Sequence, residues 1–154
     1  MKVELQIFDK RDSLGTALNF KHDGDSGMDL EAYLPESPMI ISIGSRALVP
    51  TGIHIAIPLG YEGQVRSRSG LAINKGIFVL NSPGTIDSGY RGEIKVVLQN
   101  IGNEAFMIHD GDRIAQLVIA PIVSSVILQI VNVYGLSDLG DTSRNEAGFG
   151  STGV

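Results

Sequence analysis

The sequence predicts an all-β domain built as a β-sandwich or jelly roll. Short runs in which apolar residues alternate with other residues recur along the chain, most clearly at 53–57, 92–100 and 106–119, and each is bounded by Gly, Pro, Asn or Asp. Helical stretches do not alternate with these runs, and no internal repeat is visible. The pattern is therefore typical of short strands joined by many turns.

Two further segments complete the predicted fold, one helical and one free of charges. In SGLAINKG, residues 69–76, Ser69 is a good N-cap and Gly76 a good terminator for one short helix. The charge-free run 114–137 is long enough to be tested as a membrane span. Pro121 interrupts it and β-branched residues dominate it, so we interpret it as two buried strands and expect no membrane partner.

Composition limits the class of protein and the kind of partner. With 154 residues, 43% hydrophobic and 19% charged, the chain is long enough for one domain with a proper core. No cysteine is present and the segment MKVELQIFDKRD lacks the apolar core of a signal peptide, so we expect a cytoplasmic protein. The net charge of -5 argues against a nucleic-acid partner. Arginines beside glycine-rich stretches favour a small polyanionic ligand instead.

The stretch RSRSGLA contains a candidate phosphate site. A serine that caps a helix offers its hydroxyl, free backbone N–H groups and the positive end of the helix dipole to one point. Arg68 stands beside Ser69 and would add a positive charge there. The structural alternative is an ordinary capped helix with a solvated arginine.

The stretch NSPGTIDSGYRGEIKV, which begins at Asn81, contains the candidate catalytic group. Its glycines allow a sharp reversal, and the arms of such a hairpin can present N–H and C=O groups to the edge of a flat heterocycle. Asp87 could orient and deprotonate a water, and Tyr90 could lay its ring against a sugar. The alternative is a β-turn whose Asp caps its own backbone and whose Tyr merely packs.

Charged residues elsewhere suggest weaker sites. In DGDRIAQLVI we interpret Asp112 and Arg113 as a structural ion pair, with Gln116 either facing solvent or donating to a phosphate. The stretch DGDSGMDLEA holds the clustered acids Asp23, Asp25 and Asp29, which could bind Mg²⁺ through waters or form a solvated loop. The three histidines lack ligand spacing, so we assign them no metal.

The last fifteen residues, GDTSRNEAGFGSTGV, differ in character from the rest. Their glycines and hydroxyl residues alone favour a frayed tail. A lone Phe149 among glycines suggests instead a segment that closes over something flat. We therefore divide the chain into a domain at 1–139 and a flexible arm at 140–154.

Taken in order, five stretches resemble the five motifs of the trimeric dUTP diphosphatase (dUTPase) family, and the likeness runs from about residue 26 to the C-terminus. They are SGMDL, RSGLA, GTIDSGYRG, GDRIAQ and RNEAGFGSTG. The resemblance implies a β jelly-roll homotrimer whose sites are each built from three subunits. It implies Mg²⁺-dependent hydrolysis of dUTP to dUMP and pyrophosphate, which keeps uracil out of DNA and supplies dUMP for thymidylate synthesis.

The resemblance also implies a role for each matching residue. Asp87 would activate the attacking water, Tyr90 would stack on the deoxyribose and exclude a 2′-hydroxyl, and Asp29 would hold the water shell of the magnesium ion. The uracil would be read by Asn81 and by the backbone of Gly84, Thr85, Ile86 and Asp87. The phosphates would be held by Arg68, Ser69, Gly70 and Gln116. The arm would contribute Arg144, Phe149, Gly150, Ser151 and Thr152, and Lys95 would face the pocket.

Departures from the family pattern and two rival functions remain open at this point. Ser67 stands where the second motif usually has Pro, and Asn145 and Ala147 stand where the arm usually has Gly. A dCTP deaminase of the same fold would need a glutamate at the position of Val97, and without a carboxylate there proton shuttling has no agent. A non-catalytic nucleotide-binding protein would be expected to lose Asp87 or the arm.

Overall fold

The structure, a computed structural model, describes residues 3–11, 18–123 and 128–142. Within these residues, eleven short strands form four antiparallel sheets. The strands are β1 (Gln6–Asp9), β2 (Gly27–Glu31), β3 (Met39–Ile41), β4 (Arg46–Pro50), β5 (Ile53–Ala56), β6 (Tyr61–Arg66), β7 (Ile77–Val79), β8 (Gly84–Ile86), β9 (Lys95–Asn100), β10 (Phe106–Ile108) and β11 (Arg113–Pro121). Two helices accompany them, α1 (Ser69–Lys75) and the 3₁₀-helix η1 (Leu136–Leu139). The predicted all-β class with one short α-helix is confirmed.

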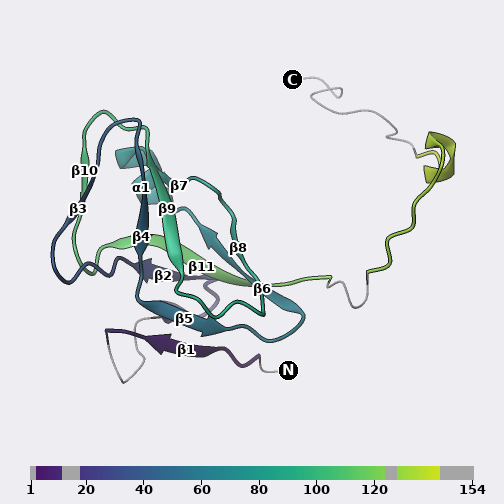
Figure 1. Ribbon diagram of the computed structural model, residues 1–154, viewed down its shortest axis with the longest axis horizontal. Coiled ribbons are helices and arrows are strands. Elements are labelled where there is room, and N and C mark those ends of the chain that lie inside the picture. The colour runs from purple at the N-terminus through teal and green to yellow at the C-terminus, as the bar shows by residue number, and fades with distance from the viewer. Residues whose placement is uncertain (1–2, 12–17, 124–127, 143–154) are drawn as a thin grey trace. The chain divides into compact units, whose positions relative to one another are not determined.

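The sheets follow the orders β2-β11-β6-β8, β4-β9-β7, β1-β5 and β10-β3 (Figure 1). Every pair of neighbouring strands is antiparallel. The described strands do not close into a barrel, since each sheet ends at two edge strands. The chain divides into two units, residues 1–122 and 123–154, and all eleven strands belong to the first.

The core of the first unit is aliphatic. Alternation along the strands turns one set of side chains inward, as in β9, where Val96 and Leu98 are buried and Lys95 is exposed. The largest fully buried side chains include Leu30, Ile41, Ile53, Ile77, Leu98, Ile108, Ile114 and Leu117. This packed interior holds the turns that carry the functional residues.

The short helix α1 begins and ends close to the predicted positions, but its cap differs. Gly76 ends it, as predicted, and has φ 65°, the left-handed conformation typical of a terminating glycine. The N-cap position is Arg68, with extended backbone and no side-chain capping bond, so Ser69 is the first helical residue. The prediction of a serine N-cap is wrong by one position.

The charge-free run after Arg113 forms one strand where two were predicted. Strand β11 ends at Pro121, and residues 128–134 form no strand within the described part of the chain. Ile130, Val131 and Tyr134 are 81%, 70% and 101% exposed. The prediction of a second buried strand is therefore wrong for this chain taken alone, because a strand needs a partner that its own described residues do not supply. None of the described helices is long and apolar enough to cross a membrane.

Candidate active site

The bend between β8 and β9 borders a cavity of about 430 Å³, a volume within the range of small-molecule sites. Strand β8 borders the cavity, and its first residue, Gly84, pairs with Val65 of β6, which also lines the cavity. Seven of the predicted site residues line the cavity, namely Asn81, Gly84, Thr85, Ile86, Asp87, Tyr90 and Lys95. The structure thus gathers the residues predicted to meet base, sugar and attacking water on one surface.

The glycine at the start of β8 allows an amide side chain to approach the strand. A Cβ atom on Gly84 would lie 3.2 Å from Nδ2 of Asn81 and 3.3 Å from Cβ of Val65. A bare backbone at this position leaves the Asn81 amide and the β8 peptide groups together at the cavity. Such groups can read the edge of a flat heterocycle by hydrogen bonding.

Asp87 follows β8 and keeps its carboxylate free. Its side chain is exposed and makes no hydrogen bond or ion pair with the described residues, while its backbone carbonyl accepts from the Tyr90 N–H at 3.0 Å. The turn is therefore closed by the backbone, and the alternative of a self-capping aspartate is not realised. A free carboxylate on a cavity can accept a proton from a bound water.

Tyr90 lies back over the chain that follows it. Its hydroxyl donates to the backbone carbonyl of Glu93 at 3.0 Å, and a Cβ atom on Gly92 would collide with the phenol ring. Glycine at 92 is therefore required by the position of the ring. The side chain stays 46% exposed and lines the cavity, so one face of the ring can meet a ligand.

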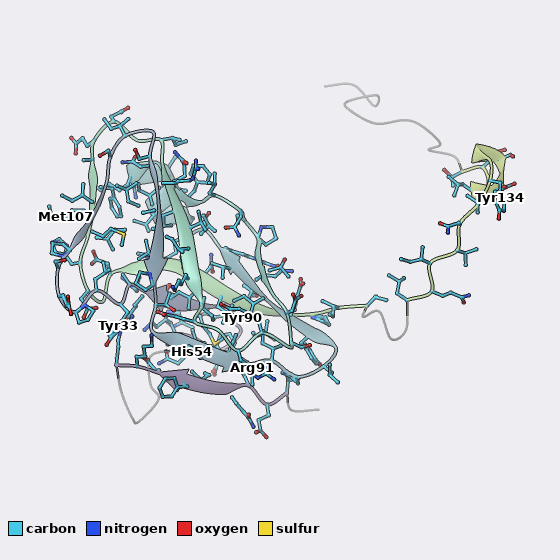
Figure 2. The ribbon with its side chains drawn as sticks, in the orientation of Figure 1. Tyr33, His54, Tyr90, Arg91, Met107 and Tyr134 are labelled. Carbon is cyan, nitrogen blue, oxygen red and sulfur yellow. The ribbon has the colours of Figure 1, made fainter. Side chains whose placement is uncertain are left out.

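Arg91 stiffens the bend from its other side. Its Nη1 donates to the carbonyls of Ser88 and Tyr90, both at 2.7 Å. The Arg91 carbonyl accepts from Nδ1 of His54, a residue of β5, at 3.0 Å in the tautomer that carries a proton there. Figure 2 labels Tyr90, Arg91 and His54, which lie on the same side of the unit.

A second group of predicted residues forms an ion-pair cluster outside the cavity lining. Asp29 on β2 accepts from Nε of Arg68 at 3.0 Å and from Nη1 of Arg113 at 3.4 Å. The Arg68 Nη1 also donates to the Arg113 carbonyl at 3.1 Å. The predicted pairing of Asp112 with Arg113 is wrong, because Asp112 instead accepts from the His109 N–H at 2.8 Å.

Gln116 belongs to the same cluster and supports the loop before α1. It pairs with Asp29 on β2 and with Arg66 on β6, and its amide donates to the Ser67 carbonyl at 2.9 Å. A Cβ atom on Gly27 would meet the amide oxygen of Gln116, so glycine at 27 leaves room for the side chain in this position. Gln116 is half-buried, and the interpretation in which it faces solvent is wrong.

Glu93 is the charged cavity residue that sequence reasoning missed. Its side chain is 13% exposed, and its two oxygens accept from the Gly52 N–H at 2.9 Å and from Nζ of Lys10 at 3.1 Å. Burial raises the pKa of Glu93, but the Gly52 bond, Lys10 and the nearby Lys95 outweigh burial and place the pKa below its usual value. Its only signal in the sequence is its place at the end of GTIDSGYRGE.

The remaining predictions concern the start of α1, the arm, the metal site and the position of Val97. Ser69 and Gly70 are exposed at the start of α1, next to Arg68 and apart from the cavity lining. Arg144, Phe149, Gly150, Ser151 and Thr152 lie outside the described residues, as do Asn145 and Ala147. The described residues hold no group of three or more His, Cys, Asp or Glu side chains suited to a metal ion. Val97 does line the cavity, with an aliphatic side chain.

A small all-β chain with an acid-bearing cavity and a separate arginine cluster has the features of a protein that binds a small polyanionic ligand. A family model described as dUTPase matches residues 15–153, and the chain belongs to that family. The family predicted from the five motifs, and with it the class of enzyme, is confirmed.

Named relatives agree with this family. A deoxyuridine 5'-triphosphate nucleotidohydrolase of Roseobacter denitrificans is 47% identical over 154 residues, covering 99% of this chain and 97% of that protein. A protein of the same name from Rhizobium johnstonii is 52% identical over 136 residues, covering 88% of this chain and 83% of that protein.

Solved structures show the same fold. A dUTPase of Staphylococcus bacteriophage 80alpha with dUPNHPP has a TM-score of 0.78 and 25% identity, covering 98% of this chain and 99% of that chain. A mutant dUTPase of phage phi11 of S. aureus, studied for its coordination of a structural Mg(II) ion, has a TM-score of 0.72 and 22% identity, covering 87% and 99%. The predicted jelly-roll fold is confirmed.

Proposed function

We propose that this chain hydrolyses dUTP to dUMP and pyrophosphate by attack of water on the α-phosphorus. The observation that carries the proposal is the free carboxylate of Asp87 on a cavity that also holds Asn81 and the ring of Tyr90. A base, a sugar and an attacking water can meet at these three groups. The relatives named deoxyuridine 5'-triphosphate nucleotidohydrolase support dUTP as the substrate.

Each group has a separate task in the proposed reaction. The Asn81 amide and the β8 backbone bind the uracil edge, and Tyr90 contacts the deoxyribose where a 2′-hydroxyl would collide with its ring. Asp87 accepts a proton from water as the oxygen approaches phosphorus, so the nucleophile gains charge while the pyrophosphate leaves. Catalysis then depends mainly on positioning and charge neutralisation.

Magnesium fits this chain only in a particular way. Asp29 is a single carboxylate engaged by two arginines, and no cluster of three acids is available in the described residues. A magnesium ion that keeps most of its waters and binds chiefly to phosphate oxygens needs no more than one such carboxylate. We propose that Asp29 holds a water of that ion, which when bound neutralises phosphate charge.

The cavity and the arginine cluster are proposed to meet in a homotrimer. Neither Arg68 nor Gln116 lines the cavity, and apolar residues such as Ile130 and Val131 are exposed on the single chain. Association of three copies would cover such residues. It would also bring the ion-pair cluster of Asp29, Arg68 and Arg113 in one chain to the cavity of another. The arm at 140–154 would close the same shared site.

The substitution Asp87→Asn tests the proposed base. The amide keeps the shape of the carboxylate but cannot take a proton from water, so we expect the rate of dUTP hydrolysis to fall by ~10²–10⁴-fold while dUTP still binds. The measurement is product formation from dUTP with Mg²⁺, together with nucleotide affinity by calorimetry. Turnover within a few-fold of wild type would remove Asp87 from this role.

Product identity separates the proposed function from its rivals. Incubation of the wild-type protein with dUTP, dCTP, UTP and dTTP should yield dUMP and pyrophosphate from dUTP. Deamination of dCTP would support the deaminase reading, although Val97 places an aliphatic side chain where that reaction needs a carboxylate. Binding of dUTP without any product would identify a non-catalytic protein.

A further inference from the structure

We propose that Glu93 is a positioning residue for the nucleotide cavity. Its carboxylate holds the return arm of the bend and thereby sets the ring of Tyr90, which discriminates deoxyribose from ribose. This inference rests on the proposed function, because the task of the ring is taken from it. The physical link runs from the Glu93 side chain through its own backbone to the Tyr90 hydroxyl.

The Glu93 carboxylate is fully engaged and points away from solvent. Oε1 accepts from the Gly52 N–H at 2.9 Å and Oε2 pairs with Nζ of Lys10 at 3.1 Å. Gly52 is buried, and no other described residue accepts from its N–H, so loss of the carboxylate would leave a buried donor unsatisfied. The side chain therefore ties the bend to the turn between β4 and β5 and to the residue after β1.

The backbone of the same residue fixes the tyrosine. The carbonyl of Glu93 accepts the Tyr90 hydroxyl at 3.0 Å, and the ring packs over Gly92. The ring is thus held by a bond to a residue whose own position depends on the carboxylate. A displacement of Glu93 moves the acceptor and releases the outer end of the ring.

Neighbouring anchors hold the chain on both sides of Glu93, at Arg91, whose carbonyl accepts from Nδ1 of His54 at 3.0 Å, and at Ile94. The Ile94 N–H donates to the Ile53 carbonyl at 2.8 Å, and Oγ1 of Thr51 donates to the Ile94 carbonyl at 2.6 Å. Both bonds fix β9 at its start. Glu93 stands between these anchors, where its carboxylate ties the return arm of the bend to the turn between β4 and β5. Removing the carboxylate therefore loosens the residues between Arg91 and Ile94 without unpairing β9.

Lys10 keeps this carboxylate compatible with a polyanionic ligand. Glu93 lines the cavity that is proposed to receive a nucleoside triphosphate, and an unpaired negative charge there would repel the phosphates. The ion pair with Lys10 neutralises the charge and keeps it turned toward Gly52. The segment after β1, far from the bend in sequence, thereby contributes to the site.

Four variants test the inference through kcat/KM for dUTP and for UTP. Glu93→Ala should lower the dUTP to UTP ratio roughly ten-fold or more, because small misplacements of a substrate-contacting group cost up to about a hundred-fold. Glu93→Gln keeps an oxygen for Gly52 and should change the ratio by less than about three-fold. Tyr90→Ala should lower the ratio at least as far as Glu93→Ala, and the double variant should lose no more than Tyr90→Ala alone. Glu104→Gln, at an exposed loop position, is the matched control and should leave the ratio unchanged.

Two outcomes would overturn the inference. One is a dUTP to UTP ratio unchanged in Glu93→Ala, which would mean that the anchors at Arg91 and Ile94 suffice. The other is a further loss in the double variant, which would mean that Glu93 affects the ratio by a route other than Tyr90. If Glu93→Ala does not fold, Glu93→Asp, too short to reach both partners, takes its place. A wild-type protein inactive on dUTP would defeat the proposed function. The inference would then be decided by a crystal structure of the variant, in which a retained bond between the Tyr90 hydroxyl and residue 93 contradicts it and a lost bond supports it.

Discussion

Ser67 shows how a single residue can connect two strands, β7 and β11. Its hydroxyl accepts from the Val79 N–H at 2.9 Å, and its carbonyl accepts from the Gln116 amide at 2.9 Å. Val79 lies on β7, the edge strand of its sheet, and its N–H points away from the partner strand. A proline, usual at this motif position in the family that the sequence resembles, would have no hydroxyl to offer. The departure therefore supplies an acceptor to an otherwise unpaired edge.

Replacing this hydroxyl should reduce stability. Ser67→Ala leaves the N–H of the buried Val79 without its acceptor, which costs about 1–3 kcal/mol. The free energy of unfolding measured in urea should fall by that amount. Ser67→Thr keeps the hydroxyl and is the matched control, with a change of about 1 kcal/mol or less. Equal stability of Ser67→Ala and wild type would mean that water replaces the serine.

At the scale of elements, the helix α1 has a glycine near each end, and the two glycines serve different purposes. Gly76 has φ 65°, and a Cβ atom there would lie 2.6 Å from the Gly102 backbone nitrogen. Gly70 has open space around its Cα. Gly76 is therefore required by its backbone conformation and by packing. Gly70 is exposed at the place where free backbone N–H groups are proposed to bind phosphate.

The pair gives opposite expectations for the same substitution. Gly76→Ala should lower the free energy of unfolding by about 1–3 kcal/mol, because alanine is strained at positive φ and meets the neighbouring backbone. Gly70→Ala should raise it by about 0.5–1 kcal/mol, since alanine loses less entropy in a helix. Thermal and urea unfolding of both variants measure the two effects. A stabilising Gly76→Ala would contradict the assigned left-handed cap.

The same elements show which features sequence alone can predict. The helix end at Gly76 was predicted because a helix terminator is a local signal. The alternation in β9 was predicted for the same reason. Glu93 was missed because its partners Lys10 and Gly52 stand 83 and 41 positions away. Such contacts follow from topology, which periodicity does not encode.

The error after Pro121 has a different physical origin. Residues 128–134 are apolar and rich in β-branched side chains, which is why a strand was predicted there. The described residues nevertheless form no strand in this segment. A strand is completed by a partner, and apolar patterning does not say whether that partner belongs to the same chain. The roles of the predicted site residues stay predictions for a similar reason, since they depend on a ligand and on other subunits.

At the scale of the whole molecule, apolar side chains are exposed in both units. Ile40 on β3 and Met107 on β10, the second of which is labelled in Figure 2, oppose each other across their two-stranded sheet. They are 57% and 47% exposed. Tyr134 and its apolar neighbours are exposed in the second unit. Exposed apolar side chains on both units fit the proposed homotrimer, in which cavity, arginine cluster and arm come from different chains.

Shared sites predict that two inactive variants restore each other. A chain lacking residues 144–154 keeps Asp87 but has no arm, while Asp87→Asn keeps the arm but has no base, so each should form a folded and nearly inactive trimer. If the arm acts on a neighbouring subunit, a site is complete when Asp87 comes from a truncated chain and the arm from a full-length one. Each condition is met by about half of the chains in an equal mixture, so refolding the two together should restore up to about a quarter of the wild-type activity. Native mass spectrometry can confirm that mixed trimers have formed. If these mixed trimers are inactive, the arm serves its own subunit. Activity that rises with the fraction of mixed trimers requires a site made by more than one chain.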